Sequence, residues 1–175
     1  MEKENIAVAL DKKGHKIVVI NNIMFYGKRR LPWNEVEKYL KRYIGQVVAV
    51  SETGENIHIA SDFPDEFIHS QDTMAVRGPN AKAKANLVQG IYHMIQISRK
   101  TKEILNLKEK NSTKAKCGWN RYLTRFALPV MSSENIILYY NVYLATLIVR
   151  KDAKRQLYLY DVVHVKKEDS VKFTL

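Results

Sequence analysis

The sequence has little cysteine, glycine and proline, and it has no long hydrophobic run. The single cysteine, Cys117, excludes an internal disulfide and a zinc cluster of several cysteines, so we expect a reducing compartment. Seven glycines and four prolines exclude collagen-like and low-complexity material. The longest apolar-rich stretch, residues 136–149, contains Asn141 and is shorter than the roughly 20 residues that a membrane helix needs.

Targeting and metal-binding signals are also missing. The first ten residues lack the basic and apolar segments of a signal peptide, so we expect a cytoplasmic protein that does not enter a membrane. The histidines show no ligand spacing, and no Asp/Glu cluster indicates a magnesium or calcium site. Phosphate-loop, nucleophile-elbow and dinucleotide motifs are absent. The sequence therefore predicts no metal site and no cofactor.

The net charge of +11 is concentrated in one part of the chain. Residues 1–80 carry eleven basic and eleven acidic side chains, whereas residues 81–125 carry eleven basic side chains against Glu103 and Glu109 alone. Such a charge excess attracts polyanions and speeds their association. We favour a nucleic-acid surface. A solvated face, an acidic protein partner and a membrane surface are the alternatives.

Residues 1–72 are predicted to form a small, charge-neutral α+β unit. Two apolar runs, Ile6–Leu10 and Lys16–Ile20, flank a glycine-containing turn and indicate a hairpin. Helical spacing predicts a helix from Glu35 to Tyr43, with Asn34 as its N-cap and Gly45 just after its end. Residues 46–50 and 57–60 indicate a second strand pair.

Residues 73–175 are predicted to form a basic unit, a long helix packed on a curved antiparallel sheet. The helix is expected over residues 81–105. One of its faces is apolar and the opposite face is polar. The buried face comprises Leu87, Ile91, Met94, Ile95 and Ser98, and the polar face comprises Lys82, Asn86, Gln89, His93, Gln96 and Lys100. Three extended runs with short turns, residues 122–131, 136–150 and 156–166, indicate an antiparallel meander. The predicted fold class is α+β.

Two features indicate chemistry with phosphates. Lys84 lies near the start of the predicted helix, where backbone N–H groups favour an anion, and on its apolar side. It is interpreted either as a phosphate contact or as a lysine whose stem covers the core edge. In the segment from Lys114 to Phe126, cations alternate with aromatic residues, as in surfaces that neutralise phosphates while bases stack.

Arg121 and Arg125 lie on one face of a predicted strand, where two guanidinium groups could hold a phosphate. The alternative is a sheet-edge strand with solvated arginines and a buried Trp119. His164, the only histidine in the predicted C-terminal sheet, is a candidate general acid or base, or else a packing or surface residue.

Five strings resemble one family, the nuclease-like domain of the polyvalent proteins of phages and conjugative elements. They are Phe63–Phe67, Asn80–Asn86, Gly118–Tyr122, Arg125–Val130 and Leu159–Asp161. That domain is grouped with the barnase–EndoU–colicin–RelE-like nucleases. The resemblance covers about residues 16–168 and implies a helical part followed by a curved antiparallel sheet, with metal-independent cleavage of RNA.

The chain departs from the family pattern at one position, where Lys110-Asn111 stands in place of a Lys-His pair. His164 or His93 would then have to move protons, or this member binds without cutting. The leading hypothesis is an RNA-directed nuclease-like domain of a mobile element, and the alternative is a module that binds nucleic acid or an acidic protein. The predicted catalytic residues are Arg121, Arg125, Lys84 and His164. The predicted nucleic-acid-binding residues are Lys82, Lys100, Lys110, Lys114, Lys116, Trp119 and Tyr122.

Overall fold

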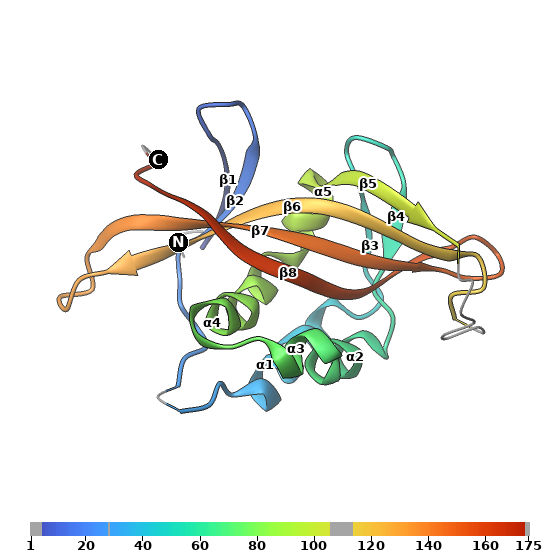
Figure 1. Cartoon of the computed structure of the whole chain (residues 1–175), viewed down its shortest axis with the longest axis horizontal. Helices are drawn as coiled ribbons and strands as arrows, with labels where there is room; N and C mark the ends of the chain where they lie inside the picture. Colours follow the sequence, from blue (N-terminus) through green and yellow to red (C-terminus); the bar gives the residue numbers. More distant parts are fainter. Residues whose placement is uncertain (1–4, 28, 106–113, 174–175) are drawn as a thin grey trace.

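Three long strands form the centre of the fold. The computed structural model describes residues 5–27, 29–105 and 114–173. Strands β6 (Gly118–Met131), β7 (Ile137–Lys151) and β8 (Leu157–Val171) pair antiparallel in sequence order and run across the whole molecule (Figure 1). The predicted α+β class and the predicted meander are confirmed, and β6 and β8 are longer than the pattern indicated, whereas β7 has the predicted length.

Strands from the N-terminal part complete the sheet on both sides. They form the two predicted hairpins, β1 (Ile6–Leu10) with β2 (Lys16–Ile20) and β3 (Val47–Ala49) with β4 (Asn56–His58). β2 pairs with β6 and β4 pairs with β8, both in parallel, so the sheet is mixed rather than purely antiparallel. The division of the chain at residue 72 stays a prediction, while strands from both sides of it share this sheet.

The helices gather mainly on one side of the three long strands (Figure 1). They are α1 (Trp33–Leu40), α2 (Phe63–His69), α3 (Gln71–Ala75), α4 (Gly78–Leu87) and α5 (Ile91–Ile97), with the short 3-10 helices η1 (Lys41–Tyr43) and η2 (Val88–Gly90). The prediction of Asn34 as an N-cap is wrong, because α1 already begins at Trp33, after Pro32. The Pro32 carbonyl accepts hydrogen bonds from the N–H groups of Glu35 and Val36 and so starts the helix earlier.

The expected helix over residues 81–105 is shorter and interrupted. The 3-10 turn η2 separates α4 from α5 at Gly90, where a Cβ atom would lie only 3.0 Å from the Val18 side chain. Helical structure ends at Ile97, because Ser98 is extended and its hydroxyl donates to the Ile95 carbonyl at 2.7 Å. Residues Arg99–Ile104 form strand β5 and pair antiparallel with β6. Pairing with a sheet edge overrides the helical pattern there.

The predicted apolar helix face is confirmed, because Leu87, Ile91, Met94 and Ile95 all have no exposed surface and belong to one large core. The predicted polar face is wrong at Asn86 and Gln89, which are buried. The Asn86 side chain accepts hydrogen bonds from the backbone N–H groups of Met24 and Phe25 and donates one to the Phe25 carbonyl. It therefore holds the segment after β2 against α4.

Candidate functional site at the sheet edge

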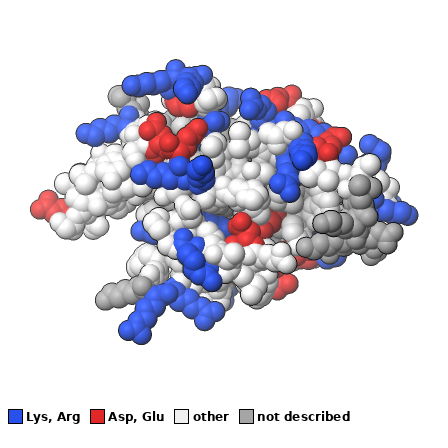
Figure 2. Space-filling model, in the orientation of Figure 1, with Lys and Arg blue, Asp and Glu red and all other residues white. Residues whose placement is uncertain are grey.

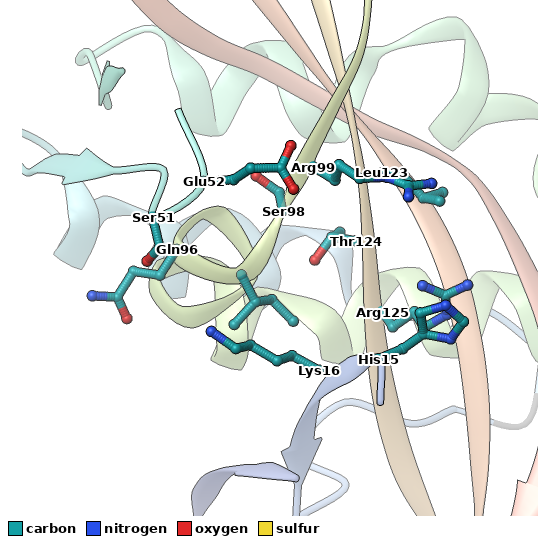
Figure 3. Close-up of a pocket in the computed structure, with 11 residues that line it drawn as sticks. His15, Lys16, Ser51, Glu52, Gln96, Ser98, Arg99, Leu123, Thr124 and Arg125 are labelled. Atoms are coloured by element: carbon teal, nitrogen blue, oxygen red, sulfur yellow. The ribbon is translucent and has the colours of Figure 1, made fainter. Parts of the chain in front are cut away.

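A cleft opens where β6 lacks a neighbour along part of one edge. On this edge β5 pairs with residues 119–123 of β6, and β2 pairs with Phe126 and Ala127. Between these pairings lies a cleft of about 390 Å³, lined by residues 15–16, 51–52, 96–99 and 123–125. We call it the sheet-edge cleft. Figure 3 shows His15 and Arg125 on one side of it, Ser51 and Gln96 on the other, and Lys16 and Thr124 between them.

Local hydrogen bonds fix the walls of this cleft. The backbone N–H of Ser51 donates to the Gln96 carbonyl at 3.0 Å, which ties the β3–β4 turn to the end of α5. The Thr124 hydroxyl donates to the Met94 carbonyl at 2.9 Å, which ties β6 to the same helix. Hydrogen bonds to backbone carbonyl groups of α5 therefore hold these two walls of the cleft in place.

Three cationic side chains line the cleft, one from each of three strands: Lys16 of β2, Arg99 of β5 and Arg125 of β6. Lys16 and Arg99 are exposed, and neither has an ion-pair partner among the described residues. Glu52 is the one carboxylate in the lining. The balance of charge in the cleft favours an anionic ligand.

Arg125 is positioned by an acidic neighbour across the sheet. Its Nε lies 3.0 Å from one carboxylate oxygen of Glu168, and its Nη2 lies 3.4 Å from the other. Glu168 therefore occupies two of the five N–H donors of a guanidinium and fixes the plane of the group. The Arg125 side chain is 15% exposed and lines the cleft.

His15 enters the cleft from the turn between β1 and β2 and pairs with Asp11. Its Nδ1 lies 2.9 Å from Asp11 Oδ2, while Asp11 Oδ1 accepts the backbone N–H groups of Lys13 and His15. Burial opposes ionisation of Asp11, but the hydrogen bonds from His15 and Lys13 outweigh it and lower the pKa of that carboxyl. The turn thus holds an ionised carboxylate against an imidazole.

The other predicted residues of β6 follow the two-residue period of the strand. Asn120, Tyr122 and Thr124 are buried on the helix side, whereas Trp119, Arg121 and Arg125 are half-buried on the opposite face. Arg121 and Arg125 therefore share a face, but only Arg125 reaches the sheet-edge cleft. Trp119 packs edge-on against Tyr160 with ring centroids 5.1 Å apart.

Lys84 lies on the helix side of the sheet and is completely buried. Its Nζ lies 2.7 Å from Asp72 Oδ2 and 3.1 Å from Asp161 Oδ1, and it sits 5.0 Å from the centre of the Phe67 ring. Burial raises the pKa of Asp161, although Lys84 opposes that shift. The structure thus does not bring Lys84 together with Arg121 and Arg125. A phosphate would reach this ammonium group only after the aspartates moved.

His164 is exposed on β8 at an irregularity in the β7–β8 pairing. Its φ of +55° lies in the left-handed region, which histidine adopts more readily than most residues but still infrequently. The described residues give its ring no hydrogen-bond or ion-pair partner. It does not line the sheet-edge cleft.

The predicted nucleic-acid-binding lysines are dispersed, and two of them are neutralised. Lys100 pairs with Glu55 and Glu103, and Lys114 pairs with Asp62 and Glu66. On the face seen in Figure 2, acidic side chains lie among the lysines and arginines, so the charge excess of the sequence does not form one continuous patch there. Lys82 and Lys116 are exposed, Tyr122 is buried, and Lys110 lies outside the described residues.

A second charged cluster surrounds Asp62, just before α2. The guanidinium of the buried Arg150 lies 3.2 Å from Asp62 Oδ2, and Lys114 contacts the same oxygen. Burial raises the pKa of Glu66, and the neighbouring Asp62 raises it further. These groups bridge α2 to β7, and the exposed Lys114 takes part in this structural cluster.

A second cleft of about 400 Å³ lies beside α1 and includes Phe25, Tyr39 and Arg42. Its Arg42 guanidinium lies 3.5 Å from the centre of the Tyr39 ring, and its Nε donates to the Tyr39 carbonyl. Lys38, the other cation of this cleft, pairs with Glu35. The sheet-edge cleft is the better candidate site, because its Lys16 and Arg99 have no ion-pair partner among the described residues.

Sequence reasoning missed Lys16, Arg99 and His15. The pairing of Asp11 with His15 across a glycine turn was a weak local signal, but nothing in the sequence places residues 15, 51, 99 and 125 together. No helix within residues 5–27, 29–105 and 114–173 combines the length and apolar character needed to cross a membrane. Within the same ranges, no three His, Cys, Asp or Glu side chains form a group that could hold a metal ion.

Comparison with family models, with curated proteins and with solved structures gives no match for this chain. An interpretation of its function therefore rests on the geometry of the sheet-edge cleft and on the residues that resemble the nuclease-like domain.

Proposed function

We propose that this chain acts on RNA and holds a backbone phosphate in the sheet-edge cleft. The observation that carries the proposal is that Lys16, Arg99 and Arg125, from three different strands, all line one cleft. A site built on rigid strands holds its side chains more precisely than a site on loops. The volume of about 390 Å³ lies within the usual range of ligand pockets, about 300–1,000 Å³.

The half-buried face of β6 supplies a path for the rest of an RNA strand. Arg121 lies four residues before Arg125 on this face, which corresponds to about 13 Å along the strand. Trp119 lies two residues before Arg121 on the same face and packs against Tyr160. Alternating cations and aromatic rings suit a single strand, whose phosphates are neutralised while its bases stack.

The proposed reaction is metal-independent cleavage of the RNA backbone, as the resemblance to the nuclease-like domain implies. The ribose 2′-hydroxyl attacks the adjacent phosphorus, and the cationic side chains stabilise the negative charge that develops on the phosphate oxygens. An origin in a mobile element follows from the same resemblance and stays a prediction. Binding of RNA without cleavage, or binding of an acidic protein, are the alternatives.

The binding part is tested with the double variant Lys16→Gln/Arg99→Gln and a short single-stranded RNA. Hydrogen bonds to charged groups contribute about 1.5–3 kcal/mol each, so the loss of two contacts is expected to weaken binding at least about tenfold. The slope of log K against log salt is expected to become less steep by up to about 0.7, the value for the one phosphate that the cleft holds. The matched control, Lys41→Gln/Lys154→Gln, removes two exposed charges elsewhere. An equal loss in both variants would refute the cleft as the binding site.

Cleavage is tested by incubating the protein with mixed RNA in EDTA and, separately, in magnesium. We expect products with 2′,3′-cyclic phosphate and 5′-hydroxyl ends in both buffers. Cleavage in magnesium alone would contradict the metal-independent reaction. Salt-dependent binding without products would favour the non-catalytic alternative, and a partner captured after nuclease treatment would favour a protein ligand.

A further inference from the structure

Backbone hydrogen bonds of the β1–β2 turn hold the His15–Asp11 pair in place, although both side chains are partly exposed. The His15 N–H donates to Asp11 Oδ1 at 2.8 Å, and the Asp11 N–H donates to the His15 carbonyl at 2.9 Å. The side-chain contact between Nδ1 and Oδ2 at 2.9 Å comes in addition to these backbone contacts. The imidazole therefore has one fixed partner and one fixed place at the rim of the sheet-edge cleft.

The pairing selects which ring nitrogen is free. An ionised carboxylate only accepts hydrogen bonds, so the nitrogen that faces Asp11 carries the proton and Nε2 becomes the basic atom in the neutral ring. The His15 side chain is 40% exposed, and Nε2 has no hydrogen-bond partner among the described residues. A histidine held by a carboxylate on its far side is the usual arrangement of a general base.

Charged groups from several elements surround this imidazole. Lys16 follows it in β2, Arg99 comes from β5, Arg125 comes from β6, and Glu52 comes from the β3–β4 turn. The three cations are the groups that would hold a phosphate and stabilise its developing charge, and the Glu52 carboxylate lies beside Ser98 and Arg99 (Figure 3). The cleft thus combines a base and cationic stabilisers, the two components that cleavage of an RNA backbone needs.

We propose that His15, positioned by Asp11, is the group that transfers protons during RNA cleavage in the sheet-edge cleft; this inference rests on the proposed function. His15 Nε2 takes the proton of the ribose 2′-hydroxyl, whose oxygen forms a bond to the adjacent phosphorus. The bond from phosphorus to the 5′-oxygen breaks, and that oxygen receives a proton from water. The products are a 2′,3′-cyclic phosphate and a 5′-hydroxyl, and protonated His15 returns its proton to solvent.

This assignment explains how the chain tolerates asparagine at position 111, where the resembling family has histidine. A base that enters from the β1–β2 turn does not depend on residue 111. It also replaces His164 in the proposed chemistry, because His164 lies outside the cleft and Asp11 gives His15 a carboxylate partner.

The test compares His15→Asn with a matched control, His69→Asn. His69 is also exposed and pairs with an aspartate four residues earlier, Asp65, at 3.1 Å, but it lies on α2 away from the cleft. The rate of RNA cleavage in EDTA is expected to fall at least about 100-fold in His15→Asn, because general acid–base catalysis contributes about 10²–10⁴-fold. Cleavage by His69→Asn is expected to equal that of the unmodified chain. Affinity for a 2′-deoxy-substituted, uncleavable strand is expected to stay within threefold in both variants, about 0.7 kcal/mol.

Asp11→Asn tests the positioning role. Without the carboxylate, Nδ1 of His15 is no longer held and the ring can adopt either tautomer, so the cleavage rate is expected to fall while affinity for the uncleavable strand stays unchanged. An unchanged melting temperature is the check on folding. In the unmodified chain, the ring-proton signals of His15 are expected to shift in NMR spectra when inorganic phosphate is added, whereas those of His69 stay in place.

The outcomes separate the two proposals. Undiminished cleavage by His15→Asn, or loss of cleavage in His164→Asn instead, would overturn the role of His15 while the proposed function stands. An unmodified chain that binds RNA but never cleaves it would overturn both the reaction and the role of His15. An unmodified chain that does not bind RNA would overturn the proposed function itself.

Discussion

Replacement of the buried Lys84 by methionine measures how much the charge cluster between α4 and β8 contributes to stability. Nζ has carboxylate oxygens at 2.7 and 3.1 Å and no exposed surface. At an effective dielectric constant of about 20, a unit charge pair 3.1 Å apart attracts by about 5 kcal/mol before desolvation is counted. Removal of one partner from such a pair typically costs about 3–5 kcal/mol, because the other charge stays buried.

We therefore expect Lys84→Met to lower the free energy of unfolding by about 3–5 kcal/mol at pH 7. This loss in the free energy of unfolding should be smaller at pH 5 than at pH 7. Burial already raises the pKa of Asp161, and without Lys84 that carboxyl takes up a proton more readily in the folded state. A carboxyl group whose pKa is raised in the folded state stabilises the fold at low pH. That stabilisation is lost as the pH rises through the raised pKa.

Urea denaturation at both pH values measures the effect, and two further variants define it. Lys82→Met, at an exposed position two residues earlier on α4, is expected to change stability by less than about 0.5 kcal/mol. The double variant Lys84→Met/Asp161→Asn is expected to recover at least about 2 kcal/mol, because the carboxylate that would otherwise stay buried without its cation is then replaced by a neutral amide. If Lys84→Met stays within about 1 kcal/mol of the unmodified chain, the reasoning is wrong. If it remains folded but binds RNA tenfold more weakly, Lys84 contacts phosphate after all.

Two other substitutions test separate features of the sheet. Gly118→Ala is expected to destabilise the fold by at least about 2 kcal/mol in urea denaturation, because Gly118 has φ of +101° and its new Cβ would overlap the Ile104 carbonyl oxygen. A melting temperature equal to that of the unmodified chain would contradict this close approach. Burial opposes ionisation of Glu55, but hydrogen bonds from Lys100 and Tyr122 outweigh it and lower the pKa of that carboxyl below 4.5. The stability that ionised Glu55 contributes is present above pH 4.5 and is lost as the pH falls through the lowered pKa. Between pH 5 and pH 3, the melting temperature of Glu55→Gln is therefore expected to fall less than that of the unmodified chain.

Local patterns predicted the elements whose structure depends on neighbours in sequence. The β1–β2 hairpin, the three-stranded meander and the apolar face of the central helix all follow from periods of two or 3.6 residues. The helical prediction failed at Arg99–Ile104, because this segment lies against an open edge of β6 and pairs there. The helical period places Asn86 on a solvated face, because it does not reveal that the backbone of Met24 and Phe25 needs a hydrogen-bonding partner.

The candidate site was predicted only in part. The shared face of Arg121 and Arg125 follows from the strand period. The cleft itself requires the parallel pairing of β2 with β6, which joins residues more than 100 positions apart and leaves no trace in local sequence. Residue type alone points to Lys84 and His164, and neither lies in the cleft, because residue type does not determine which face or edge the tertiary structure exposes.

The two parallel pairings also determine when the sheet can be completed during synthesis. Val18 pairs with Phe126 and Ile57 pairs with Leu157, so both N-terminal hairpins leave the ribosome long before their neighbours exist. Ile17, Val18, Val19 and Ile20 are buried in the finished fold and, although β1 pairs with them, would lack their β6 neighbour during that interval. Contacts of such long sequence separation fold slowly and leave apolar strand edges exposed to aggregation. The nascent chain therefore depends on β6 to complete the first hairpin and on β8, the last strand, to complete the second.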